Sequence, residues 1–204
     1  MAKKSETFKN TGRFLSMKTI KKIVIIGPES TGKSTLCEKL AAHYHTSWVP
    51  EYAREYLQKH GPNYSSTDLI DIAAGQIELE EEALKKLHDE KHQSAFNLHD
   101  TPKLFIDTDM YVMKVWSEFV FNKCNNWILN RVAERKYDLY LLCDVDLPWI
   151  RDGLREYPDL KVRKRLYYFY KDLLLNQRVP WCEISGEYDE RFSKAINFIE
   201  KTFT

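Results

Sequence analysis

The sequence lacks the features that mark membrane, secreted and disulfide-bonded proteins. No window approaches the roughly 20 apolar residues of a membrane-spanning helix, and the N-terminus lacks the apolar core of a secretory signal. The 204 residues include four cysteines, none of them in a CxxC pair. We therefore expect reduced cysteines in the core of a cytoplasmic protein that has no membrane partner.

An excess of either charge is also missing, since 31 Lys and Arg residues face 30 Asp and Glu residues. A protein that grips nucleic acid usually carries a strong positive field, so we expect a small-molecule partner and no nucleic acid. The six histidines show no metal-ligand spacing, and we assign them no metal site. The sequence leaves the oligomeric state open.

From Ile20 onward the sequence alternates short β-branched or aromatic runs with long amphipathic stretches. This pattern is typical of repeated βα units on a parallel sheet, and it predicts an α/β fold. The predicted strands are Lys22–Ile26, Thr46–Val49, Lys103–Ile106, Tyr137–Cys143 and Trp181–Ile184. Predicted helices include Lys33–Tyr44, Asp109–Phe121, Trp127–Arg135, Asp159–Asn176 and Tyr188–Phe203. A further helix is expected after Ser66, with the acidic run 78–82 on its solvated face.

These elements define the expected domain organisation. Residues 20–204 are predicted to form one domain, and the polar residues 1–19 a flexible arm. A polar segment near 145–163, punctuated by Gly and Pro, follows the fourth predicted strand. Long loops of this kind are often functional, and we predict that this one is a lid.

The strongest motif is Gly-Pro-Glu-Ser-Thr-Gly-Lys-Ser at residues 27–34, a match to GxxxxGK[ST]. It lies directly after an apolar strand and directly before a helix, as phosphate binding requires. Gly27 and Gly32 allow the tight loop, Lys33 reaches the β- and γ-phosphates, and the Ser34 hydroxyl ligates Mg²⁺. The predicted cofactors are therefore ATP and Mg²⁺. The predicted nucleotide-binding residues are Gly27, Glu29, Ser30, Thr31, Gly32, Lys33, Ser34, Thr35, Arg151 and Arg155.

Carboxylates follow two of the predicted strands, at the sheet edge where α/β proteins bind ligands. Asp107 ends the third strand and is predicted to hold Mg²⁺ together with Ser34. Glu51 follows the second strand and is predicted to orient or deprotonate an acceptor hydroxyl. The alternative for both residues, and for nearby Asp109, is a structural place at a helix N-terminus.

Aromatic and basic residues complete the predicted site. Tyr52 and Tyr56 supply rings for a flat base, although both could instead be core aromatics. Trp116 is either core filling or a wall of the acceptor pocket. The guanidinium of Arg54 has a fixed arrangement of donors that can bind phosphate or carboxylate. In the lid, Arg155 is predicted to stabilise the transferred phosphate when the loop closes, and the alternative is a solvated surface. The predicted catalytic residues are Lys33, Glu51, Asp107 and Arg155. The predicted substrate-binding residues are Glu51, Tyr52, Arg54, Asp107, Asp109 and Trp116.

Together these residues resemble the ribosylnicotinamide kinase domains of NadR-like proteins, within the P-loop nucleoside and nucleotide kinases. The resemblance covers Ile20 to the C-terminus and rests on residues 27–36, 51–55, 105–109 and 149–155. It implies ATP-dependent phosphorylation of the 5′-hydroxyl of nicotinamide riboside. It also implies a P-loop three-layer sandwich, whose five-stranded parallel sheet has the order 2-3-1-4-5 and helices on both faces. NadR-like chains can carry two further domains before the kinase, and we expect this chain to lack them.

Two alternatives stay open at this point. One is another nucleoside or nucleotide kinase, of the deoxynucleoside or thymidylate type. A monophosphate acceptor needs an additional basic clamp, whereas the cationic nicotinamide suits the carboxylates Glu51, Asp107 and Asp109. The other alternative is a non-catalytic ATP-binding regulator or a motor ATPase. No apolar run ends in the Asp-Glu pair that a motor's hydrolytic site needs.

Overall fold

The computed structural model describes residues 19–93 and 101–203, so the predicted arm lies outside the described residues apart from its last position. The five strands of these residues form one all-parallel sheet, in the order β2-β3-β1-β4-β5. This order confirms the predicted fold. The strands are β1 (Lys21–Ile26), β2 (Trp48–Val49), β3 (Lys103–Asp107), β4 (Leu139–Cys143) and β5 (Trp181–Ile184).

The second strand is shorter than the sequence predicts, because Thr46 does not belong to it. The Thr46 amide donates a hydrogen bond to the Ala41 carbonyl at 2.9 Å. The Thr46 hydroxyl donates to the Lys103 carbonyl at 2.8 Å. Thr46 therefore closes the turn after the first helix, and pairing with β3 begins at Trp48.

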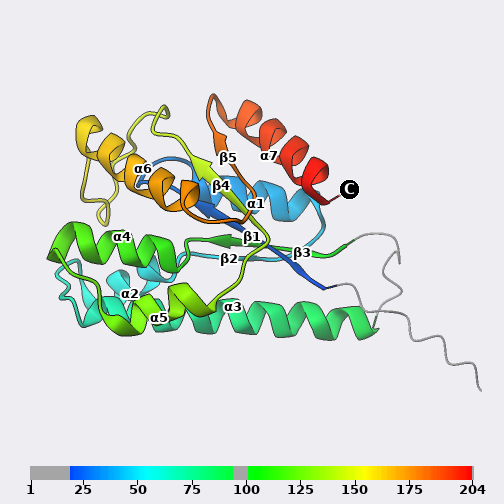
Figure 1. Cartoon of the computed structure of the whole chain (residues 1–204), viewed down its shortest axis with the longest axis horizontal. Coiled ribbons are helices and arrows are strands. Elements are labelled where there is room, and N and C mark those ends of the chain that lie inside the picture. The colour runs from blue at the N-terminus through cyan, green and yellow to red at the C-terminus, as the bar shows by residue number, and fades with distance from the viewer. Residues whose placement is uncertain (1–18, 94–100, 204) are drawn as a thin grey trace, which may run out of the picture.

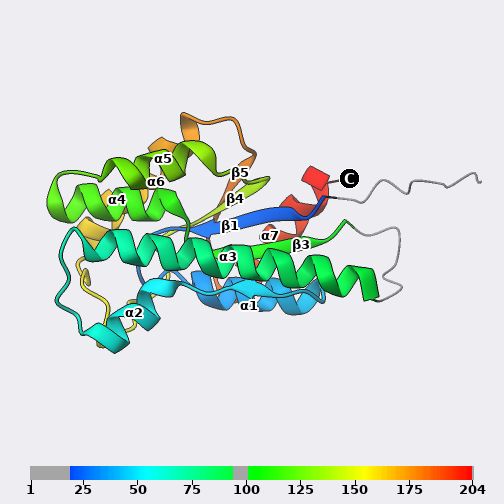
Figure 2. The ribbon, with the colours of Figure 1, turned by 90° about the horizontal axis from the view of Figure 1, so that it is seen from below.

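Helices cover both faces of the sheet and make the three layers (Figures 1 and 2). Helices α1 and α7 pack together on one face, and α3, α4 and α6 cover the other. Helix α5 packs on α3 and α4, and α2 packs on α3. The helices are α1 (Lys33–His43), α2 (Tyr52–His60), α3 (Asp68–Gln93), α4 (Met110–Phe121), α5 (Asn126–Glu134), α6 (Leu160–Leu175) and α7 (Tyr188–Phe203).

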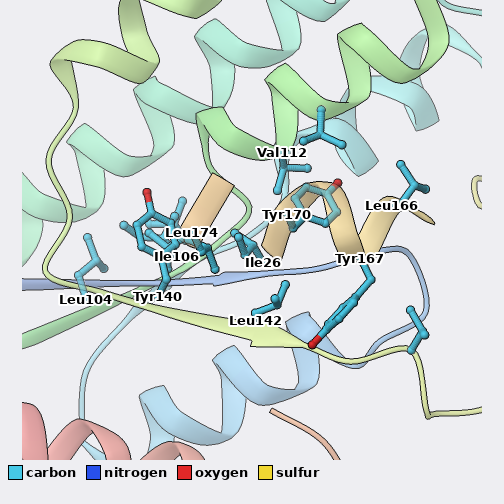
Figure 3. Close-up of a cluster of buried hydrophobic side chains, with 14 of the residues drawn as sticks. Ile26, Leu104, Ile106, Val112, Tyr140, Leu142, Leu166, Tyr167, Tyr170 and Leu174 are labelled. Carbon is cyan, nitrogen blue, oxygen red and sulfur yellow. The ribbon is translucent and has the colours of Figure 1, made fainter. Parts of the chain in front are cut away.

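The core divides between the two faces because alternate strand residues point to opposite sides. Ile23 and Ile25 of β1 are fully buried with residues of α1 and α7. Val24 and Ile26, one position along, are buried on the other face. There they join a cluster of strand residues with side chains of α4 and α6 (Figure 3). Burial on both faces explains why the strands read as continuous apolar runs.

One residue of the acidic run on α3 does not face solvent as expected. Glu80 is 2 % exposed, and its carboxylate is 3.1 Å from the Lys22 ammonium and 2.8 Å from the Arg135 guanidinium. The Tyr137 hydroxyl also donates to it, at 3.0 Å. A buried carboxylate needs such partners, and these tie α3 to β1 and to the segment before β4.

Among the described residues, no helix is long and apolar enough to cross a membrane. The expectation that the cysteines lie in the core holds for two of them, because Cys124 and Cys182 are only partly buried. All four cysteines are free, and Cys37 and Cys143 are buried. Burial raises the pKa of the Cys143 thiol to about 12, so this thiol stays protonated and inert.

Helix α4 begins at a buried carboxylate. Asp109 caps the helix by accepting hydrogen bonds from the Tyr111 amide at 2.9 Å and the Val112 amide at 3.4 Å. The Tyr140 hydroxyl donates to its second oxygen at 2.8 Å. Burial outweighs these bonds and raises the pKa of Asp109 to about 6. Asp109 is therefore a structural cap whose ionisation opposes folding.

This shift predicts a pH dependence of stability. Between about pH 4 and 6 the folded protein retains a proton on Asp109 that the unfolded chain has lost, so the free energy of unfolding falls as pH rises. Asp109→Asn keeps a capping oxygen and removes the titration. The variant should exceed the wild type in stability by about 3 kcal/mol at pH 7, and this gain should vanish near pH 4. Urea unfolding across this range measures it, and a pH-independent difference would contradict the assignment.

Candidate active site

A cavity lies at the carboxyl ends of the parallel strands and runs along the phosphate loop at residues 27–34. Its remaining walls come from α2, α4, the lid and α6. These wall residues include Glu51, Arg54, Leu57, Val112, Trp116, Phe119, Leu154, Arg155, Glu156, Tyr157, Leu166 and Tyr170. The cavity therefore joins the phosphate loop at one end to a wall of aromatic and apolar side chains at the other.

The phosphate loop has the conformation that its glycines predict. Gly27 has a φ of 144°, and a Cβ there would lie 2.6 Å from the Cys143 carbonyl oxygen. Gly32 has a φ of 77° and caps α1 without a side chain, which leaves the first-turn amides open to a phosphate. The Lys33 ammonium donates to the Pro28 carbonyl at 3.0 Å. Lys33 is thus held inside the loop, where anionic oxygens would bind.

Ser34 and Asp107 lie together, as predicted for a magnesium site. The Ser34 hydroxyl donates to Asp107 Oδ2 at 2.5 Å, and Asp107 is fully buried. Its Oδ1 atom has no hydrogen-bond partner among the described residues. Burial, together with the Glu51 charge, raises the pKa of Asp107 to about 6. A buried carboxylate oxygen without a partner, beside a serine hydroxyl, fits Mg²⁺, which binds few protein oxygens and retains waters.

Glu51 stands at the N-cap position of α2, but its carboxylate makes no capping hydrogen bond in the described structure. It lines the cavity, and the Thr108 hydroxyl approaches it at 3.5 Å. Thr108 itself has a φ of 77°, a strained conformation for a β-branched residue. Such strain costs about 1–3 kcal/mol and is found mostly at functional sites. The geometry favours the chemical interpretation of Glu51 over the capping one.

The predicted lid segment rests on the phosphate loop. The Ser30 hydroxyl donates to the Pro148 carbonyl at 3.3 Å and accepts from the Ile150 amide at 2.8 Å. The Glu29 carboxylate accepts from the Glu156 amide at 3.0 Å and the Tyr157 amide at 3.1 Å. Burial raises the pKa of Glu29. Two side chains of the loop therefore bind the backbone of the lid at both ends.

The two lid arginines have different positions. Arg155 lines the cavity, and its guanidinium donates to the Ile150 carbonyl at 2.5 Å and to Ser30 Oγ at 3.4 Å. Arg151 is exposed and does not line the cavity, so its predicted contact with nucleotide is not supported. The Arg151 side chain is exposed to solvent, outside the set of residues that line the cavity.

On the acceptor side, Arg54 and Trp116 line the cavity as predicted, and two other residues do not. The Tyr52 ring packs against Gly75 so closely that a Cβ there would lie 2.1 Å from Tyr52 Cε1. Asp109 faces Tyr140 as the cap of α4. Neither Tyr52 nor Asp109 lines the cavity, since packing occupies one side chain and capping the other, and their contacts with substrate stay a prediction.

The sequence interpretation also missed several wall residues. Tyr170 is 5 % exposed, and burial together with the charges of Glu51 and Glu29 raises the pKa of its hydroxyl. Figure 3 shows its ring beside Val112 in a cluster of buried side chains. Tyr64 does not line the cavity but contacts two residues that do. Its hydroxyl accepts from Trp116 Nε1 at 2.8 Å and donates to the Glu156 carboxylate at 2.7 Å. The sequence placed Tyr170 in a predicted helix but could not show that its side chain borders the cavity.

The contact between Glu29 and the lid predicts a graded effect on lid opening. Glu29→Ala removes the acceptor of two amides, and their hydrogen exchange should rise about tenfold. Glu29→Gln keeps a neutral acceptor and should give a smaller rise, because charged hydrogen bonds are roughly twice as strong. Exchange measured by NMR or mass spectrometry tests this, with the amides of α7 as the internal control. Equal exchange at Glu156 and Tyr157 in all three proteins would refute the contact.

Comparison with known proteins agrees with this geometry. The profile of a family described as an AAA domain matches residues 22–191. The NadR proteins of Escherichia coli and Salmonella typhimurium, described as trifunctional NAD biosynthesis/regulator proteins, are 26 % and 25 % identical to the chain over 189 residues. Each alignment covers 89 % of this chain and 42 % of the relative. The chain thus spans less than half the length of these curated relatives.

Solved structures share the fold. A crystal structure of NadR in complex with NR has a TM-score of 0.69 at 19 % identity, covering 90 % of this chain and 50 % of the other. Thymidylate kinase from Ehrlichia chaffeensis has a TM-score of 0.61 at 13 % identity, covering 88 % of this chain and 98 % of the other. Because the AAA domain profile matches most of its length, the protein belongs to that family, as a P-loop domain that resembles the kinase domain of NadR.

Proposed function

We propose that this chain is an ATP-dependent kinase that phosphorylates the 5′-hydroxyl of nicotinamide riboside to give nicotinamide mononucleotide. One observation carries the proposal: a single cavity joins the phosphate loop to a pocket that contains a carboxylate and aromatic walls. The comparisons support the same chemistry, since the two relatives are described as NAD biosynthesis/regulator proteins and solved NadR structures are complexes with NR, or with NAD and AMP-PNP. We expect the reaction to take place in the cytoplasm.

The donor end is proposed to bind the triphosphate of ATP. Backbone amides of residues 27–34 and the N-terminus of α1 would hold the phosphates, with the Lys33 ammonium on the transferred group. Ser34 and Asp107 would hold Mg²⁺, which neutralises phosphate charge when bound. Arg155, fixed beside Ser30, would meet the charge that develops on the transferred phosphate.

The acceptor end is proposed to bind the riboside between α2, α4 and α6. Glu51 lies on the same cavity as Lys33, so its carboxylate is suited to accept the proton of the attacking 5′-hydroxyl. The pyridinium of nicotinamide riboside carries a positive charge, which favours the aromatic rings of Trp116 and Tyr157 and the nearby carboxylates. The lid would exclude water, so that phosphate passes to the riboside and not to water.

A kinase for nucleoside monophosphates is the second candidate, because thymidylate kinases share the fold over nearly their whole length. A monophosphate acceptor needs a basic side chain for its phosphate. On the acceptor side of the cavity Arg54 is the candidate, and it already forms an ion pair with Asp152 at 2.9 Å. This pair supports the riboside, which carries no phosphate, over a monophosphate acceptor. The alternative of a regulator without catalysis predicts no ADP even when an acceptor is present.

Replacement of Lys33 tests the donor end. Lys33→Ala should lower kcat at least about 100-fold, because the ammonium would serve the transferred phosphate, while the unfolding midpoint stays close to that of the wild type. Lys39→Ala is the matched control in the same helix, since Lys39 is 3.2 Å from the exposed Asp189 on the surface. Steady-state ADP formation measures the effect. Wild-type turnover by Lys33→Ala would defeat the donor assignment.

Acceptor preference tests the other end. In a competition of purified protein with ATP and Mg²⁺, nicotinamide riboside should be converted with a clearly higher kcat/KM than thymidine or thymidine monophosphate. Glu51→Gln should lower kcat about 10²- to 10⁴-fold if Glu51 is the general base, or raise mainly KM if it only positions the riboside. Glu55→Gln, exposed one turn along α2, is the control. Preference for thymidine or its monophosphate would exclude the riboside assignment.

A further inference from the structure

We propose that Asp152 of the lid is a specificity-determining residue: it neutralises Arg54 and thereby selects nucleosides, which carry no phosphate, over nucleoside monophosphates. The inference rests on the proposed function, since it concerns the acceptor of the same site. It assigns a role in acceptor choice to a residue that contributes no group to the phosphate loop, to the magnesium site or to proton transfer.

The basic side chains of the cavity determine where a phosphate could bind. Among the described residues, those that line the cavity are Lys33, Arg54 and Arg155. Lys33 lies within the phosphate loop, and Arg155 is bonded to Ser30 of that loop and to the Ile150 carbonyl. Arg54 belongs to α2, one turn after Glu51. It is therefore the basic residue placed to receive a phosphate on the acceptor.

Asp152 occupies this arginine. Its Oδ2 atom lies 2.9 Å from Arg54 Nη2 and 3.1 Å from Arg155 Nε. Its Oδ1 atom accepts from the Leu154 amide at 3.0 Å. Burial opposes ionisation, but the hydrogen bonds from Arg54 and Leu154 and the charge of Arg155 hold the pKa of Asp152 below its usual range. The carboxylate is thus ionised at neutral pH and shared between two guanidinium groups.

The charges around Arg54 make a monophosphate unfavourable. Its phosphate would have to displace Asp152 from Arg54 or lie against the carboxylates of Glu51 and Asp152. A 5′-hydroxyl brings no charge and leaves the ion pair intact. Arg54 and Asp152 side chains are 44 % and 28 % exposed, so the pair adds little to stability. The main effect of the ion pair is on the affinity for ligands that bind beside it.

The same contact bears on product release. The monophosphate formed by the reaction carries its new phosphate near the lid, where Arg54 is already neutralised. Product would therefore be held less tightly than by a free guanidinium, and it would leave more readily when the lid opens. A kinase for monophosphate acceptors has the opposite need, because its substrate arrives with that phosphate.

Asp152→Asn tests the inference because asparagine keeps the size and removes the charge. Calorimetry with nicotinamide mononucleotide and nicotinamide riboside should show about tenfold tighter binding of the monophosphate and less than about threefold change for the riboside. Asp152→Glu keeps the charge and should retain the discrimination of the wild type. An equal change for both ligands would overturn the proposal, since it would mean that Asp152 only shapes the lid.

A second variant separates the charge effect from a disturbed lid. In Arg54→Gln/Asp152→Asn the gain in monophosphate affinity should disappear, because the gain needs a free Arg54. Persistence of the gain without Arg54 would also overturn the proposal. Thymidine and its monophosphate serve as a parallel pair. If they show the discrimination and the nicotinamide pair does not bind, the riboside assignment fails and the role of Asp152 stands. If the protein binds neither pair, both fail.

Discussion

The hydrogen bonds between the phosphate loop and the lid hold the two halves of the candidate site together. Glu29 accepts two lid amides, and Ser30 bonds the lid at Pro148 and Ile150. These bonds place Arg155 beside the loop and bring Glu156 within reach of Tyr64, which also bonds Trp116. The donor end is therefore connected to the acceptor wall through side chains, and the lid is the part that both ends share.

The charged side chains that line the cavity are distributed unevenly. This distribution is the reason for the choice of the proposed acceptor. Basic groups lie at the phosphate loop, whereas the acceptor side holds Glu51 together with an arginine that Asp152 neutralises. Asp107 is fully buried, with Oδ2 bonded to Ser34 and Oδ1 without a hydrogen-bond partner among the described residues. Such a site suits an acceptor that is neutral at the reacting hydroxyl and positive at its base. Nicotinamide riboside has both properties.

Local sequence pattern predicted the glycine loop between β1 and α1. The strand order was predicted from the resemblance to NadR-like kinase domains. The sequence could not show what tertiary contacts decide. Tyr52 and Asp109 have the right chemistry beside the right strands, but neither lines the cavity, since Tyr52 packs on Gly75 and Asp109 caps α4. Glu80 lies in an acidic run, yet partners from distant segments bury it. Tyr170 lies in a predicted helix, but nothing in the sequence indicated the cavity that it borders.

The central claim is that phosphate passes from ATP to a nucleoside hydroxyl inside this cavity. Phosphorus NMR of a reaction of the purified protein with ATP, Mg²⁺ and nicotinamide riboside tests it most directly. The account predicts one 5′-phosphomonoester for each ADP formed, little inorganic phosphate, and no ADP when the riboside is omitted. Inorganic phosphate as the main product, at the same rate with and without riboside, would contradict the claim and indicate a hydrolase.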